Sequence, residues 1–243
     1  MKAFPSKRAG DIGRDEENGS VAISEQHPFL NRAVVVGLYA FAMAYLESAV
    51  VVYLQRALSM TPATLFPLRD QATLGGLGSI ELGREVATLV MLVTVGRLAG
   101  RTSIERLAWT SVAFGIWDIG YYFWLWVFIG WPTTLGTTDL LFLLPVPWVA
   151  PVWAPMLISV ALISFGLIVA RRMRKGVPIV LKLRDWTLLI AGGVVVILSF
   201  TLDSGRIRNG EMPAPFSWPV FLIGLVFAVV GICLPLRSSA NSR

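Results

Sequence analysis

Residues 218–234 read WPVFLIGLVFAVVGICL, seventeen positions without one charged side chain. A helix needs about 17–25 mostly apolar residues to cross the hydrocarbon core of a bilayer. Further predominantly apolar stretches, some of them interrupted by charged residues, cover residues 33–54, 79–98, 107–128, 152–169 and 186–201. Only 15% of the chain is charged, against about 25% in ordinary soluble domains. The sequence therefore predicts an all-α fold, a polytopic membrane helix bundle of about six transmembrane helices.

The predicted organisation is one membrane domain between two polar tails. Residues 1–31 are polar and lack the apolar stretch of a signal peptide, so we expect a poorly ordered, uncleaved cytoplasmic tail. The six-helix domain is expected over residues 32–237, and a cytoplasmic C-terminal tail over residues 238–243. Residues 131–151, between the third and fourth helices, contain four prolines, which predicts a re-entrant or interfacial segment rather than another crossing.

The basic residues predict the orientation. Sixteen of the 21 Lys and Arg residues fall in stretches that six crossings place on one side: 1–32, 97–106, 171–184 and 237–243. Cytoplasmic loops of membrane proteins carry such an excess of Lys and Arg. We therefore expect both termini in the cytoplasm, and we attribute the net charge of +6 to topology rather than to nucleic-acid binding.

The composition argues against several classes of membrane protein. One histidine, His27, cannot supply a bis-histidine haem or an intramembrane zinc site, and one cysteine, Cys233, cannot form an internal disulfide. The chain has neither GxxxxGK[ST] nor GxGxxG, so no nucleotide-binding module is recognised. We expect no cofactor and no metal.

Charged residues enter the first, second and third of the apolar runs. Glu47 lies about seven residues from the outer end of the first helix. The second helix has an uninterrupted apolar run only over residues 86–95, so its preceding turns, with Glu81, Arg84 and Glu85, must enter the membrane. Placing a charged side chain in the middle of a bilayer costs roughly 2.5–3.5 kcal/mol, so such a residue is expected either to pair with another group or to serve a function. Glu47, Arg84 and Glu85 therefore form either a buried ion pair that joins the two helices or a polar pocket open to the outside.

Asp118 lies near the midpoint of the third helix. Tyr121 and Tyr122 follow at i+3 and i+4, and their hydroxyls are expected within reach of the carboxyl. Desolvation favours the neutral form of a carboxylic acid at this depth. Asp118 is either a protonated carboxyl that hydrogen-bonds to a tyrosine or the backbone, or a group that handles protons or binds a ligand.

Asp139 lies in the proline-rich stretch GTTDLLFLLPVPWVAPVWAP of residues 136–155. One interpretation is a re-entrant piece or interfacial helix that holds Asp139 over the outer mouth of the bundle. The other is an amphiphilic surface loop with a belt of aromatic residues.

Four stretches together resemble an uncharacterised group of bacterial six-helix integral membrane proteins: YLESAVVVYL (45–54), REVATLVML (84–92), FGIWDIGYY (114–122) and LPVPWVAP (144–151). The similarity covers roughly the first four helices. It implies a bacterial inner membrane and attaches no activity.

Three classes of function remain open. The first is binding or transport of a small ligand in an externally open pocket, whose candidate residues are Glu47, Arg84, Glu85, Asp118, Tyr121, Tyr122 and Asp139. The second is an accessory subunit of a larger membrane complex. The third is an intramembrane enzyme acting on a lipid or isoprenoid. Expected partners are membrane lipids, with a membrane protein or a second copy of the chain as further options.

Overall fold

A computed structural model describes residues 12–57, 77–142 and 146–238 of the chain. The chain divides into two compact units, Met1–Val35 and Val36–Arg243. In the first unit the described residues belong to helix α1 (Ile12–Ala57), so α1 begins inside the stretch for which a poorly ordered tail is predicted. Extending an existing helix fixes one residue for each new hydrogen bond, which costs far less than starting one. The rest of the predicted tail lies outside the described residues.

The helices of the second unit begin and end close to the predicted apolar runs. The third, for example, is capped at both ends: the Thr102 side chain accepts a bond from the Glu105 N–H, and Gly130 ends it with φ of 66°. The helices are α2 (Leu77–Ala99), α3 (Ser103–Ile129), α4 (Trp153–Arg174), α5 (Leu183–Thr201), the short α6 (Ser204–Arg208) and α7 (Trp218–Ser238).

Within the described part of the chain, five helical segments are long and apolar enough to cross a membrane: Phe29–Ala57, Ser103–Ile129, Trp153–Arg174, Leu183–Arg208 and Trp218–Arg237. This confirms a multi-pass helical membrane protein. Helix α2 forms as predicted but is not among the five, because every 18-residue window of it holds at least three charged residues. A sixth crossing stays a prediction.

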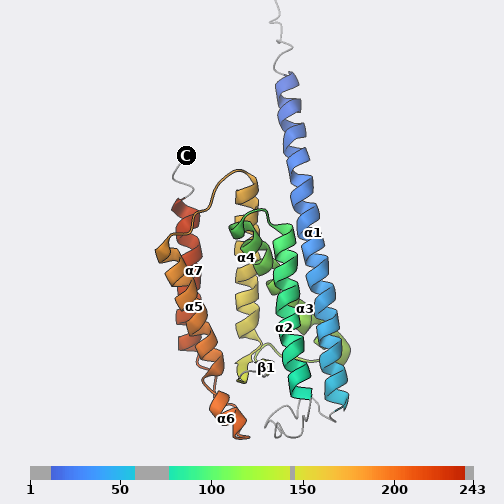
Figure 1. Ribbon diagram of the computed structural model, residues 1–243, viewed down its shortest axis with the longest axis vertical. Coiled ribbons are helices and arrows are strands. Elements are labelled where there is room, and N and C mark those ends of the chain that lie inside the picture. Colours follow the sequence, from blue (N-terminus) through green and yellow to red (C-terminus); the bar gives the residue numbers. More distant parts are fainter. Residues whose placement is uncertain (1–11, 58–76, 143–145, 239–243) are drawn as a thin grey trace, which may run out of the picture. The chain divides into compact units, whose positions relative to one another are not determined.

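The second unit is built from closely packed helix pairs. Helix α3 packs against α2 and α4, and α5 packs against α7, as the ribbon shows (Figure 1). Glycines allow the closest approaches: a Cβ at Gly115 of α3 would lie 2.6 Å from the Ser159 carbonyl oxygen of α4. At Gly192 of α5 it would lie 2.7 Å from the Gly224 carbonyl oxygen of α7. A side chain at either position would therefore push its helix pair apart.

The proline-rich segment forms an antiparallel hairpin of two short strands, β1 (Thr138–Phe142) and β2 (Trp148–Pro151). Asp139 pairs with Ala150, and the register shifts between Leu140 and Phe142. The fold is thus not purely helical, and the alternative of an interfacial helix is wrong. Proline lacks the N–H that a helix interior needs, whereas a two-stranded ribbon has free edges that tolerate it. Whether the hairpin enters the membrane stays a prediction.

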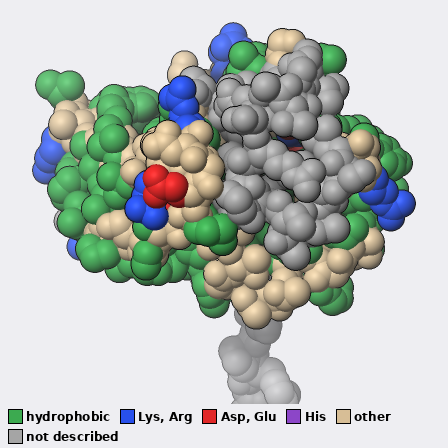
Figure 2. All heavy atoms as spheres, turned by 90° about the horizontal axis from the view of Figure 1, so that it is seen from below, with side chains coloured by type: hydrophobic (Ala, Val, Ile, Leu, Met, Phe, Trp, Pro, Cys, Tyr) green, Lys and Arg blue, Asp and Glu red, His purple; other side chains and the backbone are tan. Residues whose placement is uncertain are grey.

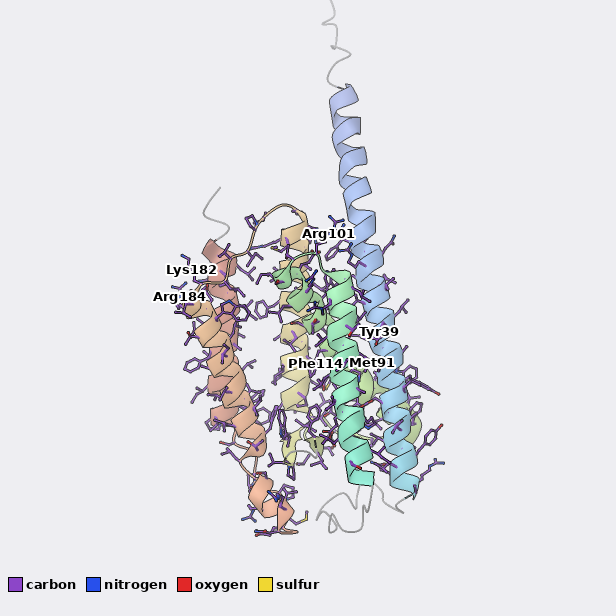
Figure 3. The ribbon with its side chains drawn as sticks, in the orientation of Figure 1. Tyr39, Met91, Arg101, Phe114, Lys182 and Arg184 are labelled. Atoms are coloured by element: carbon purple, nitrogen blue, oxygen red, sulfur yellow. The ribbon has the colours of Figure 1, made fainter. Side chains whose placement is uncertain are left out.

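The surface of this unit is largely apolar along the helices, and basic side chains lie at its ends. Large apolar side chains point outward along the helices; Leu38, Trp126 and Ile190 are each at least 60% exposed. Figure 2 shows hydrophobic side chains around the end that carries the hairpin, with Lys or Arg and acidic side chains among them. Arg101, Lys182 and Arg184 lie at the other end, where α2 ends and α5 begins (Figure 3). Lipid contact along the helices follows from this apolar surface.

Candidate functional site

Arg84 of α2 binds two glutamates from two helices. Its Nε donates to Glu81 Oε2 at 3.0 Å, and its Nη2 donates to the other oxygen of the same carboxylate. Its Nη1 donates to Oε1 of Glu47 on α1. The second Glu47 oxygen accepts a bond from Thr88 Oγ1 of α2 at 3.2 Å. An ion pair therefore joins α1 to α2, as one of the two sequence interpretations has it, with Glu81 as a further partner.

This cluster is largely shielded from water. The side chains of Arg84, Glu47 and Glu81 are 21%, 12% and 18% exposed. Glu85 is 8% exposed and lies close enough to Arg84 to interact electrostatically. Charges attract more strongly where the dielectric constant is low, and removing one partner leaves the other uncompensated. The cluster therefore holds α1 and α2 together and keeps its carboxylates largely buried.

Asp118 is joined to α4 rather than to its own tyrosines. Ser159 Oγ donates to Asp118 Oδ2 at 2.8 Å. The predicted bond from Tyr121 or Tyr122 to Asp118 is not formed among the described contacts; Tyr122 donates to Asp139 instead. A tyrosine hydroxyl lies at the far end of a long side chain, so it extends past a short carboxyl one turn away.

Asp139 enters the bundle from the hairpin. It is 5% exposed, and its Oδ2 accepts a hydrogen bond from the Tyr122 hydroxyl at 3.0 Å. Its Oδ1 accepts one from the Leu140 N–H at 2.8 Å. Burial raises the pKa of Asp139 to about 6, while these two hydrogen bonds act to lower that pKa. The hairpin thus supplies a carboxyl that titrates not far below neutral pH.

These groups converge on one cavity of about 260 Å³, here called the acidic cavity. All seven candidate residues of the sequence analysis line it: Glu47, Arg84, Glu85, Asp118, Tyr121, Tyr122 and Asp139. They come from α1, α2, α3 and β1, and Tyr121 lies within electrostatic range of Arg84, Asp118 and Asp139. The cavity is slightly smaller than the usual small-molecule pocket of about 300–1,000 Å³.

Sequence reasoning missed the apolar walls of the acidic cavity. From α5 these are Gly193, Val196, Ile197 and Phe200, and from α4 Pro155 and Ile158. The α5 residues have the spacing i, i+3, i+4, i+7 of one helix face, which is the signal that could have identified them. The remaining wall residues are Phe114, Trp117, Leu141, Phe142 and Trp148.

One polar atom of the wall has no partner. Trp117 is 7% exposed, and its Nε1–H is without a hydrogen-bond acceptor among the described residues. Most buried polar groups are hydrogen-bonded, and an unsatisfied one costs about 1–3 kcal/mol. The Trp117 indole nitrogen is therefore a buried donor without an acceptor among the described residues.

The cavity combines acidic groups with aromatic walls. Four carboxyls and one guanidinium line it, and the guanidinium is already bound by Glu47 and Glu81. No group of three potential metal ligands from His, Cys, Asp and Glu occurs among the residues that the structure describes. The chain matches no family model, no curated protein and no solved structure, so the chemistry of these residues carries the functional argument.

Proposed function

We propose that the chain is a bacterial inner-membrane protein with six crossings and cytoplasmic termini, which binds or transports a small ligand in the acidic cavity. The ligand enters from the external side, where the hairpin lies. The distribution of basic residues supports this orientation, because the ends opposite the hairpin carry Arg101, Lys182 and Arg184.

The pairing of charges supports α2 as the sixth crossing. Its charged turn holds Glu81 and Arg84 in a bidentate pair, and Arg84 also neutralises Glu47 on α1. Paired charges that face a bundle interior are the form in which ionisable residues occur within membranes. The remainder of α2 is apolar as far as Arg97 near its end.

The observation that carries ligand binding is the convergence of seven costly polar residues on one cavity. A purely structural ion pair needs neither Asp118, Asp139 nor an adjoining space of about 260 Å³. Close packing is the rule in protein interiors, and the voids that remain are few and small. A mostly apolar cavity with a few polar groups, between packed helices, is the usual form of a small-molecule site.

Gly193 allows a direct test. A Cβ at Gly193 meets no atom within 4 Å, and Gly193 lines the cavity, so Gly193→Leu should place a side chain in the cavity without a backbone clash. The matched control is Gly83→Leu on α2, where a Cβ also meets no atom within 4 Å and which does not line the cavity. Each protein is purified in mild detergent and denatured, and the released small molecules are identified by mass spectrometry.

We expect one compound to be released from the wild type and from Gly83→Leu, and to be absent from Gly193→Leu. Identical release from all three proteins would show that the bound molecules lie outside the acidic cavity. Release of none, together with no binding in a screen of small metabolites, would contradict the proposal.

A second candidate, an intramembrane enzyme acting on a lipid or isoprenoid, is favoured by one observation. Asp118 and Asp139 share a mostly apolar cavity and interact electrostatically. Two carboxyls in one apolar site are suited to general acid and base roles. Incubation with a bacterial lipid extract distinguishes the two functions: an enzyme produces a new compound that the Asp118→Asn variant does not, and a binding protein returns its ligand unchanged.

A further inference from the structure

A second cavity, of about 340 Å³, lies at the end of the second unit away from the hairpin and is here called the apolar groove. The beginnings of α3 and α5, the ends of α4 and α7, and the loop between α4 and α5 line it. Its described lining holds no charged side chain, and its one hydroxyl, that of Ser111, donates to the Leu107 carbonyl oxygen of the same helix at 3.0 Å. A buried water molecule needs two to four polar partners, so hydrocarbon suits this groove better than water does.

The groove is closed at the back and open at the side. It lies between the pairs α3/α4 and α5/α7, and between these pairs α4 contacts α7 more than α3 contacts α5. At the back, Arg172 Nη1 of α4 donates to the Leu236 carbonyl oxygen of α7 at 2.6 Å. At the mouth, Leu107 of α3 and Trp186 and Ile190 of α5 are 45%, 38% and 62% exposed. Because these helices are long and apolar enough to cross a membrane, the mouth opens towards lipid.

The exposed charges at this end of the unit are all basic. In residues 97–106 and 171–185 the described acidic side chains are Glu105 and Asp185, which are 3% and 1% exposed and accept bonds from backbone N–H groups. Figure 3 shows Arg101, Lys182 and Arg184 at this end. The exposed charged side chains of the two stretches are those of Arg97, Arg101, Arg171, Lys175, Lys182 and Arg184. Such a surface attracts anionic lipid headgroups.

Two basic residues adjoin the lining on different sides of the groove. Lys182 is exposed and follows Leu181, which lines the groove from the loop before α5. Arg106 is half-buried and precedes Leu107 at the mouth on α3. An apolar slot with a basic rim matches a molecule that joins a hydrocarbon chain to an anionic group. Trp186, partly exposed at the mouth, is of the residue type enriched where the membrane meets water.

We propose that the apolar groove binds an anionic phospholipid of the adjoining leaflet, with one acyl chain in the groove and its phosphate beside Arg106 and Lys182. This site is separate from the acidic cavity and does not depend on the function proposed for that cavity. A zwitterionic phospholipid is the weaker fit, because its cationic group meets a basic rim. A second copy of the chain packed symmetrically on the groove would bring its own basic residues against these.

Native mass spectrometry of the delipidated full-length protein in dodecyl maltoside, a neutral detergent, tests this site. The probes are phosphatidylglycerol and phosphatidylcholine with the same palmitoyl and oleoyl chains, and glycerol 3-phosphate, which has a phosphate and no chain. We expect one molecule of phosphatidylglycerol per protein to bind at least tenfold more tightly than phosphatidylcholine, and glycerol 3-phosphate not to be retained.

Two variants test the place of the acyl chain. Ser111→Leu puts a larger side chain on the groove lining and should weaken phosphatidylglycerol binding at least fivefold. The matched control is Ser164→Leu on α4, at an exposed position outside the lining, which should not change binding. Ile190→Trp narrows the mouth at a position that is 62% exposed, so it provides the test if Ser111→Leu does not fold.

A double variant tests the place of the phosphate. Arg106→Gln combined with Lys182→Gln should remove the preference for phosphatidylglycerol and leave the affinity for phosphatidylcholine little changed. The matched control combines Arg206→Gln with Arg208→Gln, which removes two exposed positive charges from α6, outside the groove, and should keep the preference.

Four results would overturn the proposal. They are equal affinity of the wild type for the two phospholipids, phosphatidylglycerol binding that the groove variants leave unchanged, a preference that the double variant keeps, and retention of glycerol 3-phosphate as tight as that of the lipid. A protein dimer that Ser111→Leu or Ile190→Trp dissociates would show that a second copy covers the groove, and would overturn the proposal as well. None of these results bears on the acidic cavity, which Gly193→Leu tests.

Discussion

Ser159 of α4 donates a hydrogen bond to Asp118 of α3, with 2.8 Å between Ser159 Oγ and Asp118 Oδ2. One turn before Asp118, Gly115 allows the α4 backbone to approach, so that the serine reaches the carboxyl. The bond is therefore a product of close helix packing, and it holds the central carboxyl at the wall of the acidic cavity.

Replacing Ser159 with alanine should measure this contact. Hydrogen bonds to charged groups contribute about 1.5–3 kcal/mol and neutral ones about 1 kcal/mol, so Ser159→Ala should lower the free energy of unfolding by about 1–3 kcal/mol. The control is Ser199→Ala, since Ser199 is 3% exposed and its Oγ donates at 2.6 Å to Val196 in its own helix. Thermal unfolding in detergent compares them, and equal losses would contradict a special role for Ser159.

Arg84→Ala should destabilise the protein strongly. It leaves Glu47 and Glu81 without their cation, and breaking a buried pair costs about 3–5 kcal/mol. Since Arg84 is 21% exposed, we expect about 3 kcal/mol. The control is Arg206→Ala, because Arg206 is 53% exposed and its pairs should contribute at most about 1 kcal/mol. Similar melting temperatures for the two variants would indicate that the Arg84 side chain is exposed to water.

The sequence predicted the helices and the polar lining for one physical reason. A charge such as Glu47 or Asp118 within an apolar run is expensive in a membrane, so it must meet a partner, and this holds whatever the rest of the fold. The Glu47–Arg84 pair follows from that constraint. The limits of the helices follow from the lengths of the apolar runs.

Other features depended on packing between distant segments. The bond from Ser159 to Asp118 joins residues 41 positions apart, and neither local spacing nor polarity singles out Ser159. The hairpin was missed because prolines conceal the strand pattern of residues 138–151. The wall of α5 around Phe200 contains no polar residue, so a search for chemistry along the chain passed over it.

Cysteine labelling tests the topology. In a Cys233→Ala background, Thr133→Cys before the hairpin and Lys175→Cys after α4 each introduce one exposed thiol. If the positive-inside rule holds, a membrane-impermeant maleimide should label position 133 in intact cells and position 175 only after permeabilisation. The reverse pattern would show that the protein has the opposite orientation in the membrane. Labelling of both positions in intact cells would show that the hairpin and the α4–α5 loop lie on the same side.

The last prediction concerns Asp139 and pH. Its pKa is about 6 in the folded protein and near 3.9 in an unfolded chain, so the folded state binds the proton more tightly. The stability that this proton contributes is fully present below about pH 4 and is lost as pH rises through 6. A pKa difference of about two corresponds to at most about 3 kcal/mol. Relative to Asp139→Asn, which does not titrate, the wild type should therefore lose up to that amount of unfolding free energy between pH 4 and pH 7. Denaturant unfolding of both proteins in the same detergent measures the difference, in which carboxyls that behave alike in the two proteins cancel. A difference that is constant with pH, or that grows in favour of the wild type as pH rises, would show that Asp139 is not held in a desolvated site.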